Sequence, residues 1–332
     1  MKGKILITGG AGFIGSEYVR QHAAKRKLVV VDKLTYAGDR QRLKAVAKDI
    51  VFHKADVANK LRMEAIFAKE KPQDVIHFAA QTHVDRSIQD NHPFIAANVT
   101  GTQNMVDLAR QFKVKRFVHI STDEVYGDST DTHSRFKETA PLRPSNPYSA
   151  TKAAAEFIVT TAVRTYGLPA VIVRPANNYG PWQYPEKFVP VIILKALHNQ
   201  HVPVYGKGLQ IREWLHVTDC ARGIDTVYKK GKTGEIYNIG SYFERPNIVT
   251  AKTILQAMEK PASLIKFVKD RPGHDFRYSV DCGKLRQLGW RPEVRFETGM
   301  RETIQWYREN IPWLQRKRIM LEELWKKVYK KK

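Results

Sequence analysis

A glycine-rich turn near the start of the chain constrains the fold more than any other stretch. Gly9, Gly12 and Gly15 stand between an apolar run at residues 4–8 and a helical pattern that begins at residue 17. Glycines permit a tight turn there, and they let backbone N–H groups at the start of the helix approach a pyrophosphate. The order of strand, glycine turn and helix predicts the first unit of a dinucleotide-binding α/β fold.

An acidic residue ends the next predicted strand. Residues 28–31 are apolar, and Asp32 follows them about 20 residues beyond the glycine turn. A carboxylate at this place accepts hydrogen bonds from an adenosine ribose and repels a 2′-phosphate. The sequence therefore favours NAD over NADP, although the neighbouring Lys33 and Arg40 weaken that preference.

Strands and helices continue to alternate through the first half of the chain. Further strands are predicted at residues 51–53, 74–78, 116–120 and 170–174, with helical patterns at residues 60–69 and 95–112. Such alternation predicts a parallel, doubly wound sheet whose ligands lie at the carboxyl ends of the strands. Candidate cofactor contacts follow the strand ends or lie in the second helical stretch: Asp56, Val57, Ala79, Ala80 and Asn98.

The regular alternation is lost near residue 175, where a loop rich in amide and aromatic residues begins. A strand at residues 235–239 is expected to return to the main sheet, and a hairpin is expected near residues 204–208. We expect an α/β protein with a Rossmann-type doubly wound parallel sheet and a smaller mixed α/β substrate lobe. The expected boundaries are residues 1–175, also taking in about 215–240, for the NAD-binding domain, and residues 176–332 for the lobe that binds substrate.

Composition narrows the class of protein. The 332 residues carry a net charge of +23, and the only dense basic cluster lies between residues 316 and 332. No nucleic-acid-binding motif accompanies it, so a host with lysine-rich proteins and attraction for a phosphorylated substrate are favoured over nucleic-acid binding. Neither a membrane span nor a signal peptide is predicted, which indicates a cytoplasmic protein. The two cysteines, Cys220 and Cys282, have no metal-ligand spacing, and no metal site is expected.

Two groups of polar residues between positions 121 and 152 carry the predicted chemistry. Tyr148 and Lys152 are four residues apart, so they share one face of a helix, and the ammonium is expected to lower the pKa of the phenol. Thr122, Asp123 and Glu124 follow the strand at residues 116–120. Adjacent residues of a regular strand face opposite ways, so the strand must end or twist for both acids to reach one substrate.

These residues resemble a known family. The glycine turn and the Tyr148–Lys152 pair are similar to those of the extended short-chain dehydrogenases/reductases, and Thr122-Asp123-Glu124 is similar to the nucleotide-sugar 4,6-dehydratases among them. Further stretches that carry the resemblance are residues 31–38, 83–88, 177–181, 185–187, 208–212 and 270–275. The resemblance covers essentially the whole chain.

The resemblance implies a reaction and a role for each catalytic residue. The expected activity is NAD-dependent dehydration of dTDP-glucose to dTDP-4-keto-6-deoxyglucose. Tyr148 would take the proton of the C4 hydroxyl, and Thr122 would hydrogen-bond the same oxygen. Glu124 would remove the C5 proton while Asp123 protonates the departing C6 hydroxyl. The two acids therefore need different pKa values.

The resemblance also implies binding residues and partners. Gln81 stands where the bacterial dTDP-glucose enzymes commonly have glutamate, which leaves the nucleobase open. A homodimer through the helices that begin near Ile95 and Tyr148 is expected. The expected cofactor residues are Gly9, Gly12, Phe13, Ile14, Gly15, Asp32, Lys33, Asp56, Val57, Ala79, Ala80, Asn98, Tyr148 and Lys152, and the expected substrate residues are His83, Asn177, Asn178, Glu186, Lys187, Arg212, Asn247, Arg271 and His274.

Three alternatives stay open at this stage. The first is the same reaction on a UDP-, GDP- or CDP-sugar. A sugar-nucleotide 4-epimerase or decarboxylase is the second, and it would use Tyr148 and Lys152 but not the acid pair. The third is a cofactor-binding regulator or nucleic-acid-associated protein without catalytic activity.

Overall fold

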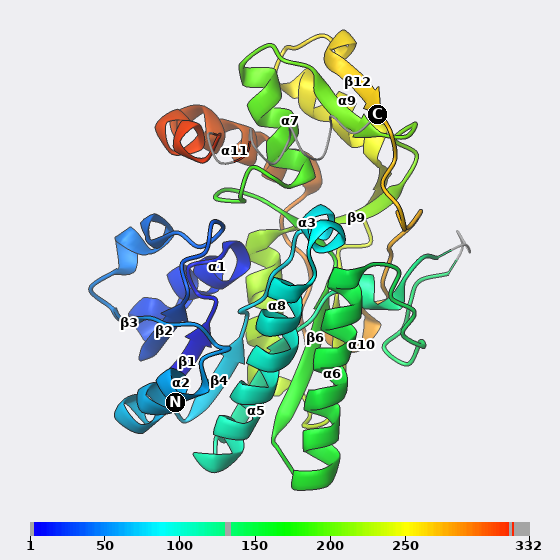
Figure 1. Cartoon of the computed structure of the whole chain (residues 1–332). Helices are drawn as coiled ribbons and strands as arrows, with labels where there is room; N and C mark the ends of the chain where they lie inside the picture. The colour runs from blue at the N-terminus through cyan, green and yellow to red at the C-terminus, as the bar shows by residue number, and fades with distance from the viewer. Residues whose placement is uncertain (1–2, 130–133, 319–320, 322–332) are drawn as a thin grey trace.

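A seven-stranded parallel sheet forms the centre of the computed structural model, which describes residues 3–129, 134–318 and 321 (Figure 1). Its strand order is β10-β6-β5-β4-β1-β2-β3, so the order reverses beside β1, where both β2 and β4 pair with it. The predicted doubly wound sheet is confirmed. The strands are β1 (Ile5–Thr8), β2 (Leu28–Asp32), β3 (Ile50–Lys54), β4 (Asp74–His77), β5 (Arg116–Ile120), β6 (Ala170–Pro175) and β10 (Ile236–Ile239).

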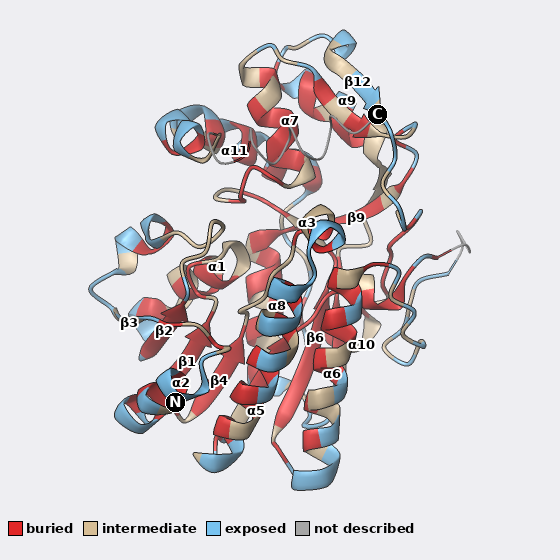
Figure 2. Ribbon diagram, in the orientation of Figure 1, coloured by how far each residue is buried: buried red, intermediate tan, exposed pale blue. Residues whose placement is uncertain are grey.

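Helices cover both faces of this sheet because successive strand residues face opposite ways. Ile5 and Ile7 of β1 pack toward α1 (Phe13–His22), α8 (Val217–Lys230) and α10 (Gly283–Gln287). Leu6 packs on the other face, toward the remaining large helices of the domain. Those helices are α2 (Lys60–Glu70), α5 (Gly101–Gln111) and α6 (Pro147–Tyr166). Figure 2 shows the strands buried between these layers.

The smaller lobe has its own sheets and its own core. Three strands lie in the order β11-β9-β7, and β12 pairs with β8. The strands are β7 (Asn177–Tyr179), β8 (Val202–Tyr205), β9 (Ile211–His216), β11 (Glu244–Pro246) and β12 (Ile265–Val268), and the helices are α7 (Phe188–Leu197), α9 (Asn247–Ala257) and α11 (Phe296–Glu309). Apolar side chains of all three helices form one buried cluster with strands β8 and β9.

The predicted hairpin near residues 204–208 is wrong. After β8 the chain turns at Gly206 and Gly208, both with positive φ, and β8 pairs in parallel with the distant β12. β9 is paired with β7 on one side and with β11 on the other, so it has no edge left for β8.

The strand β10, near residue 236, joins the main sheet beside β6. A segment late in the chain therefore belongs to the seven-stranded sheet and its helices. The exact domain boundaries stay a prediction, and the basic end of the chain at residues 319–320 and 322–332 lies outside the described residues. Within the described part of the chain, no helix is both long and apolar enough to cross a membrane.

Short helices complete the structure, and three of them matter for the site. They are η2 (Arg40–Val46), the π-helix η3 (Ile95–Thr100) and the 3-10 helix η4 (Asp123–Tyr126). The remaining ones are η1 (Ala23–Lys25), α3 (Val84–Gln89), α4 (His92–Phe94) and η5 (Ala262–Leu264).

Candidate active site

A cleft runs over the carboxyl ends of the central strands and continues between the two lobes. Its first part is a cavity of about 340 Å³ beside the glycine turn and the end of β5, and its second part is a cavity of about 160 Å³ in the smaller lobe. The two cavities share the lining residues Glu124, Asn177, Asn178, Gln183, Glu186 and Lys187. A ligand that reached both would therefore pass the acid pair.

The glycine turn leaves room for a ligand close to the backbone. A Cβ atom on Gly15 would lie 2.4 Å from the carbonyl oxygen of Gly9, so only glycine lets helix α1 start this near the turn. The Ala11 N–H donates to Oδ2 of Asp32 at 2.9 Å, which ties the turn to the end of β2. This arrangement fits the pyrophosphate and adenosine ribose of a dinucleotide.

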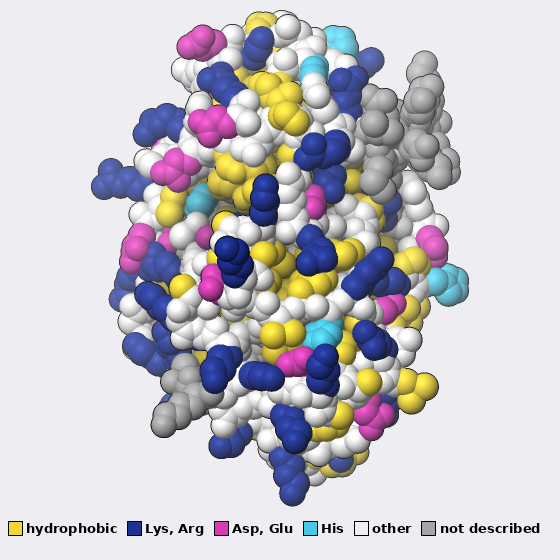
Figure 3. Space-filling view, turned by 90° about the vertical axis from the view of Figure 1, so that its left-hand side faces the viewer, with side chains coloured by type: hydrophobic (Ala, Val, Ile, Leu, Met, Phe, Trp, Pro, Cys, Tyr) yellow, Lys and Arg dark blue, Asp and Glu magenta, His cyan; other side chains and the backbone are white. Residues whose placement is uncertain are grey.

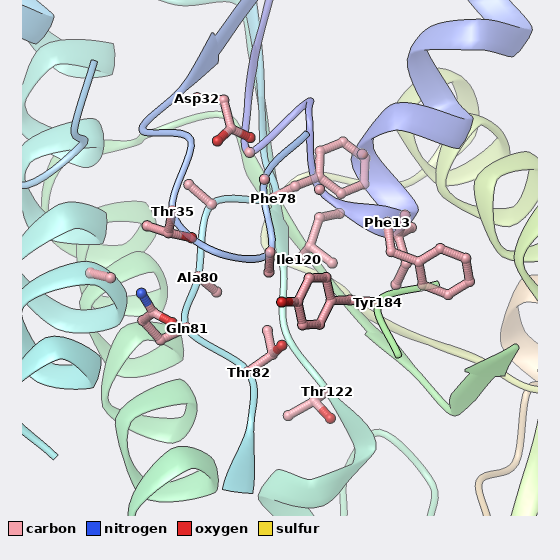
Figure 4. A pocket seen from close by; sticks show the side chains of 18 of the residues that line it. Phe13, Asp32, Thr35, Phe78, Ala80, Gln81, Thr82, Ile120, Thr122 and Tyr184 are labelled. Carbon is pink, nitrogen blue, oxygen red and sulfur yellow. The ribbon is translucent and has the colours of Figure 1, made fainter. Parts of the chain in front are cut away.

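Asp32 and Lys33 lie at the adenosine end of the first cavity, where Figure 4 shows Asp32 near Thr35. Burial raises the pKa of the Asp32 carboxyl, and the N–H groups of Leu34 and Ala11 oppose that rise by stabilising the carboxylate. The Lys33 ammonium lies 2.5 Å from Asp56. Because Asp56 balances this charge, Lys33 offers less attraction for a 2′-phosphate than its sequence position indicated.

Asn98 is the one predicted cofactor residue that does not line the first cavity. It lies fully buried in the π-helix η3, within the stretch that was expected to be regular α-helix. Its amide nitrogen donates to the Gln81 carbonyl at 3.0 Å and to the Thr151 hydroxyl at 2.9 Å, and its oxygen accepts from the Gln81 N–H. Asn98 thus fixes the segment that follows β4 without lining the cavity itself. Its direct contact with a cofactor stays a prediction.

The acid pair reaches the cleft because β5 ends before it. Thr122 caps the short helix η4, and its Oγ1 accepts from the Glu124 N–H at 3.3 Å. The turn of η4 brings Asp123 and Glu124 to the wall of the same cavity, which removes the difficulty that a regular strand would have posed. One carboxylate oxygen of each, Asp123 Oδ2 and Glu124 Oε2, is buried without a hydrogen-bond partner among the described residues.

The surroundings of Asp123 favour its protonated form. Burial raises the pKa of the Asp123 carboxyl well above its usual range, and the negative charges of Glu124 and Glu213 raise it further. Arg212 opposes this rise without cancelling it. Burial beside two acidic side chains therefore suits Asp123 as a proton donor.

Tyr148 and Lys152 lie on the first turns of α6, whose start is well defined. The Asn146 side chain accepts from the Ser149 N–H at 2.9 Å, and the Ser149 hydroxyl accepts from the Asn146 N–H, so the two residues form a capping box. Tyr148 is nearly fully buried beside Thr122. Both Tyr148 and Lys152 line the first cavity.

The predicted lowering of the Tyr148 pKa is wrong for this arrangement of side chains. Burial and the charge of Glu124 raise the pKa of Tyr148 instead. The Lys152 ammonium donates to the Ile120 carbonyl at 2.7 Å and lies 3.5 Å from His119 Nε2, and burial lowers the pKa of Lys152 to about 8. Because the ammonium is bound to β5, its effect on the phenol is too small to offset burial beside two carboxylates.

The second cavity is lined by every residue predicted to hold the substrate, namely His83, Asn177, Asn178, Glu186, Lys187, Arg212, Asn247, Arg271 and His274. The side-chain oxygens of Asn177, Asn178 and Asn247 and the Nε of Arg271 are buried without a partner among the described residues. Unsatisfied buried groups of this kind are costly unless a polar ligand pairs with them. The guanidinium groups of Arg212 and Arg271 in this cavity suit phosphate oxygens.

Some predicted substrate residues also have structural partners. His83 Nδ1 accepts from the Arg86 N–H at 3.3 Å and so caps α3, while Glu186 accepts from Arg86 Nε at 3.2 Å. His274 Nδ1 lies 2.5 Å from Asp270 Oδ1, and burial together with Arg271 and Arg212 lowers the pKa of His274 to about 4. These contacts fix the walls of the cavity, and direct substrate contact by these residues stays a prediction.

Several lining residues were not predicted from the sequence. Phe188 and Trp214 stack with ring centroids 6.2 Å apart in the smaller lobe, and they offer a flat apolar wall to a base. In the larger cavity, Tyr184 stands in the middle of the cleft and Arg42 lies in its wall (Figure 4 shows Tyr184). Aromatic residues in the loop after β6 were the only sequence signal for any of them. The described residues hold no cluster of three or more metal-ligating side chains.

Comparison with known proteins agrees with this geometry. A sequence profile of the family described as GDP-mannose 4,6 dehydratase matches residues 6–303. The dTDP-glucose 4,6-dehydratase of Neisseria meningitidis serogroup B is 48% identical over 94% of this chain and 95% of its own, and dTDP-glucose 4,6-dehydratase 1 of Escherichia coli K12 is 44% identical over 94% of each.

Solved structures give the same result. The dTDP-glucose 4,6-dehydratase of Streptomyces venezuelae, crystallised with NAD and TYD bound, superposes with a TM-score of 0.92 at 41% identity, covering 95% of this chain and 99% of that one. A UDP-glucose 4-epimerase of Thermus thermophilus in complex with NAD has a TM-score of 0.87 at 31% identity, covering 92% of this chain and 99% of the epimerase. Both reactions are thus found on this fold.

Proposed function

We propose that this chain, which belongs to the GDP-mannose 4,6 dehydratase family of nucleotide-sugar enzymes, converts dTDP-glucose to dTDP-4-keto-6-deoxyglucose with NAD as cofactor. The observation that carries the proposal is the acid pair Asp123 and Glu124 beside Tyr148, where the two cavities meet. A 4-epimerase or decarboxylase has no use for two carboxyl groups at this place, so the acid pair favours dehydration over both.

The residues of the first cavity fit a dinucleotide. The glycine turn would hold the pyrophosphate, and Asp32 would accept hydrogen bonds from the adenosine ribose. Ala79 and Ala80 at the end of β4 leave a flat surface in the cleft. When bound there, NAD would supply the hydride chemistry that oxidation at C4 and reduction at C6 of the sugar require.

Tyr148, Thr122 and Lys152 would act on the C4 hydroxyl. The Tyr148 side chain, as phenolate, accepts the proton of the C4 hydroxyl as C4 is oxidised, and Thr122 donates a hydrogen bond to the C4 oxygen. A phenol needs a nearby positive charge to act as a base near neutral pH, because burial raises its pKa here. Lys152, one helical turn along α6, would supply that charge on leaving the Ile120 carbonyl to which it is bound in this structure.

Glu124 and Asp123 would divide the elimination of water between them. The C4 ketone acidifies the C5 proton, which the Glu124 carboxylate removes. Asp123, kept protonated by burial and by its acidic neighbours, gives its proton to the departing C6 hydroxyl. Glu124 then returns its proton to C5 and is ionised again. Asp123 is left as a carboxylate and takes up a proton from solvent, while Tyr148 releases the proton that it took from the C4 hydroxyl, so the cycle loses one water and no net proton.

A homodimer in the cytoplasm completes the proposal. Helices α5 and α6 lie side by side on one surface of the molecule (Figure 1), and Ile95 and Phe157 on this side are exposed by 44% and 63%. Large apolar side chains of this kind support burial against a second copy. Both cysteines are free and buried, which fits a reducing compartment. Light scattering of the purified protein tests the dimer: a mass near twice 38.1 kDa supports it, and a monomer at micromolar concentration contradicts it.

A panel of nucleotide sugars tests the activity. The protein is incubated separately with glucose linked to dTDP, UDP, GDP and CDP, and the products are identified by mass spectrometry. We expect a 4-keto-6-deoxy sugar from dTDP-glucose with no net gain of NADH. An epimer or a pentose product contradicts dehydration, and turnover of another nucleotide in place of dTDP contradicts the proposed base.

A further inference from the structure

We propose that Arg42 is a positioning residue that holds a loop of the smaller lobe against the cofactor cleft and thereby slows the release of bound NAD. Arg42 lies in η2, between β2 and β3, and only 1% of its surface is exposed. It forms part of the wall of the first cavity. The inference rests on the proposed NAD-dependent function, but it concerns retention of the cofactor, which can be measured without the reaction.

On the side of the larger domain, Arg42 holds the glycine turn. Its Nη1 donates to the Ala11 carbonyl at 2.8 Å and to the Ala37 carbonyl at 2.5 Å. The Ala11 oxygen also accepts from the Asp39 N–H at 2.9 Å, while the Ala11 N–H is bound to Asp32. Both polar groups of Ala11 are thus engaged, so the turn that would carry the pyrophosphate is fixed in one orientation.

On the side of the smaller lobe, the same guanidinium holds Trp182. Nε and Nη2 donate to the Trp182 carbonyl at 3.1 and 2.9 Å. Trp182 has a φ of +71°, a backbone conformation that residues with a side chain rarely adopt and that persists only where the surroundings hold it. The paired hydrogen bonds from Arg42 are one such restraint, and packing of the Trp182 ring on Trp306 and Trp313 is another.

The loop held by Arg42 places Tyr184 in the cleft. Tyr184 follows two residues after Trp182, and Figure 4 shows its ring between the Asp32 end of the cavity and Thr122. The Tyr184 hydroxyl is buried without a partner among the described residues. Its ring meets the Tyr36 ring edge to face at 5.4 Å, and the Tyr36 hydroxyl donates to Glu186 at 3.1 Å. The loop therefore spans the cleft. Arg42 attaches its start to the larger domain, and Tyr36 and Arg86 attach it there through Glu186.

Burial of the Arg42 charge costs free energy, and a role in holding the loop would account for that cost. Its hydrogen bonds within the described part of the chain go to carbonyl oxygens, none of which neutralises its charge. Burial lowers the pKa of Arg42 to about 10, so the guanidinium stays protonated at neutral pH. The planar guanidinium fork presents its donors in fixed directions toward three separate carbonyl groups, a geometry that the single ammonium of a lysine does not reproduce. A reaction that regenerates its cofactor in every cycle benefits from slow cofactor release.

Exchange of bound NAD tests the role of Arg42. Wild type and Arg42→Met are purified with NAD bound, and the rate at which labelled NAD replaces it is measured without substrate. We expect exchange at least tenfold faster in Arg42→Met, and a KM for added NAD that rises by a larger factor than kcat falls. Arg116→Met is the matched control, since Arg116 also binds two carbonyls, those of Val227 and Gly231, but lies outside both cavities. It should exchange NAD at the wild-type rate even if its melting temperature falls.

The outcomes are distinct. Exchange at the wild-type rate in folded Arg42→Met, or equally fast exchange in Arg116→Met, overturns the proposal. If Arg42→Met does not fold, Tyr36→Phe removes only the hydroxyl that binds Glu186, and exchange at least threefold faster is expected from it; an unchanged rate overturns the proposal in that case. A wild-type protein that holds NAD but produces no 4-keto sugar would contradict the proposed function and leave the retention result standing.

Discussion

Asp123 and Glu124 are neighbours in the chain, yet the proposed reaction requires one to be protonated and the other ionised. The structure offers a physical basis for this division. Asp123 is 2% exposed and has Glu213 as a further acidic neighbour, and its pKa is raised by burial first and by these charges second. Glu124 lies where the two cavities meet. Because the two carboxyl groups have different surroundings, their roles can be tested separately by substituting one residue at a time.

Glu124→Gln should stop the reaction after the oxidation of C4. The amide keeps the shape of the side chain but cannot accept the C5 proton, so we expect kcat for the final product to fall at least about 100-fold. Reduced cofactor should then accumulate on the enzyme and be visible by its absorbance when dTDP-glucose is added. Normal turnover without accumulation would contradict the role of Glu124 as base.

Tyr148→Phe should block the earlier step. Without the phenol oxygen no group accepts the C4 hydroxyl proton, and the absorbance of reduced cofactor should not rise on addition of substrate. The double variant Tyr148→Phe/Glu124→Gln serves as the control, because it should behave as Tyr148→Phe alone. Persistent accumulation in Tyr148→Phe would show that another residue takes this proton.

Among the secondary-structure elements, the sequence predicted the strands of the main sheet correctly, but it did not predict the short irregular helices or the pairing of the small sheet. All six predicted strands of the first 175 residues exist, since β-branched runs between turns depend mainly on local pattern. The π-helix at Asn98, the 3-10 helix at Asp123 and the pairing of β8 with β12 were not predicted. The π-helix and the pairing of β8 with β12 depend on contacts between residues that are far apart in the chain, such as Asn98 with Thr151.

In the candidate site, too, the residues found from the sequence are those marked by local pattern, and the residues missed are those that depend on distant contacts. Glycines, acids and the Tyr148–Lys152 pair were found from spacing, because each stands at a strand end or on a helix face. Arg42 was not found, since its partners Ala11 and Trp182 lie 31 and 140 positions away in the sequence. The direction of the Tyr148 pKa was also missed, because it depends on burial and on Glu124 rather than on spacing.

The short helix η4 should depend on Gly127, which ends it. Gly127 has a φ of +76°, and a Cβ atom there would lie 2.0 Å from the Arg143 carbonyl oxygen. Gly127→Ala should therefore displace η4 and its acids, with a loss of about 1–3 kcal/mol in stability and at least a tenfold fall in kcat. Gly167→Ala is the control: its φ is +67°, no atom lies within 4 Å of its Cβ position, and it is at the far end of α6. An equal fall in kcat for both variants would contradict a specific role for η4.

The contact between α1 and α8 should give a pH-dependent stability. Burial opposes ionisation of Asp225, but hydrogen bonds from His22, Lys229 and Arg26 outweigh it and lower the Asp225 pKa. Stability from a carboxyl with a lowered pKa is complete above its unfolded value of about 4 and is lost as the pH falls through the folded value.

Asp225→Asn should therefore cost about 1–3 kcal/mol in the free energy of unfolding between pH 5 and 8, because it leaves the partly buried Arg26 without its carboxylate partner. Urea denaturation measures the difference, which should shrink below about pH 4. Asp107→Asn, which removes the more exposed pair with Lys60, should change stability by less than about 1 kcal/mol. A constant difference down to pH 3 would contradict the assignment of the effect to ionised Asp225.

At the scale of the whole molecule, the site exists only because two lobes meet. The first cavity is built mainly on the parallel sheet and the second mainly on the smaller lobe. Glu124 lines both, and Asp123 beside it lines the first. Figure 3 shows lysine and arginine side chains spread over one face among apolar and uncharged ones, without a single basic patch.

The central claim is that one hydride leaves C4 of the sugar and returns to C6 of the same molecule. Incubation with dTDP-glucose carrying deuterium at C4, followed by mass spectrometry and nuclear magnetic resonance of the product, tests it directly. We predict dTDP-4-keto-6-deoxyglucose with the deuterium in the C6 methyl group. Deuterium that remains at C4, as in an epimer, or a C6 methyl group without deuterium, would contradict the account.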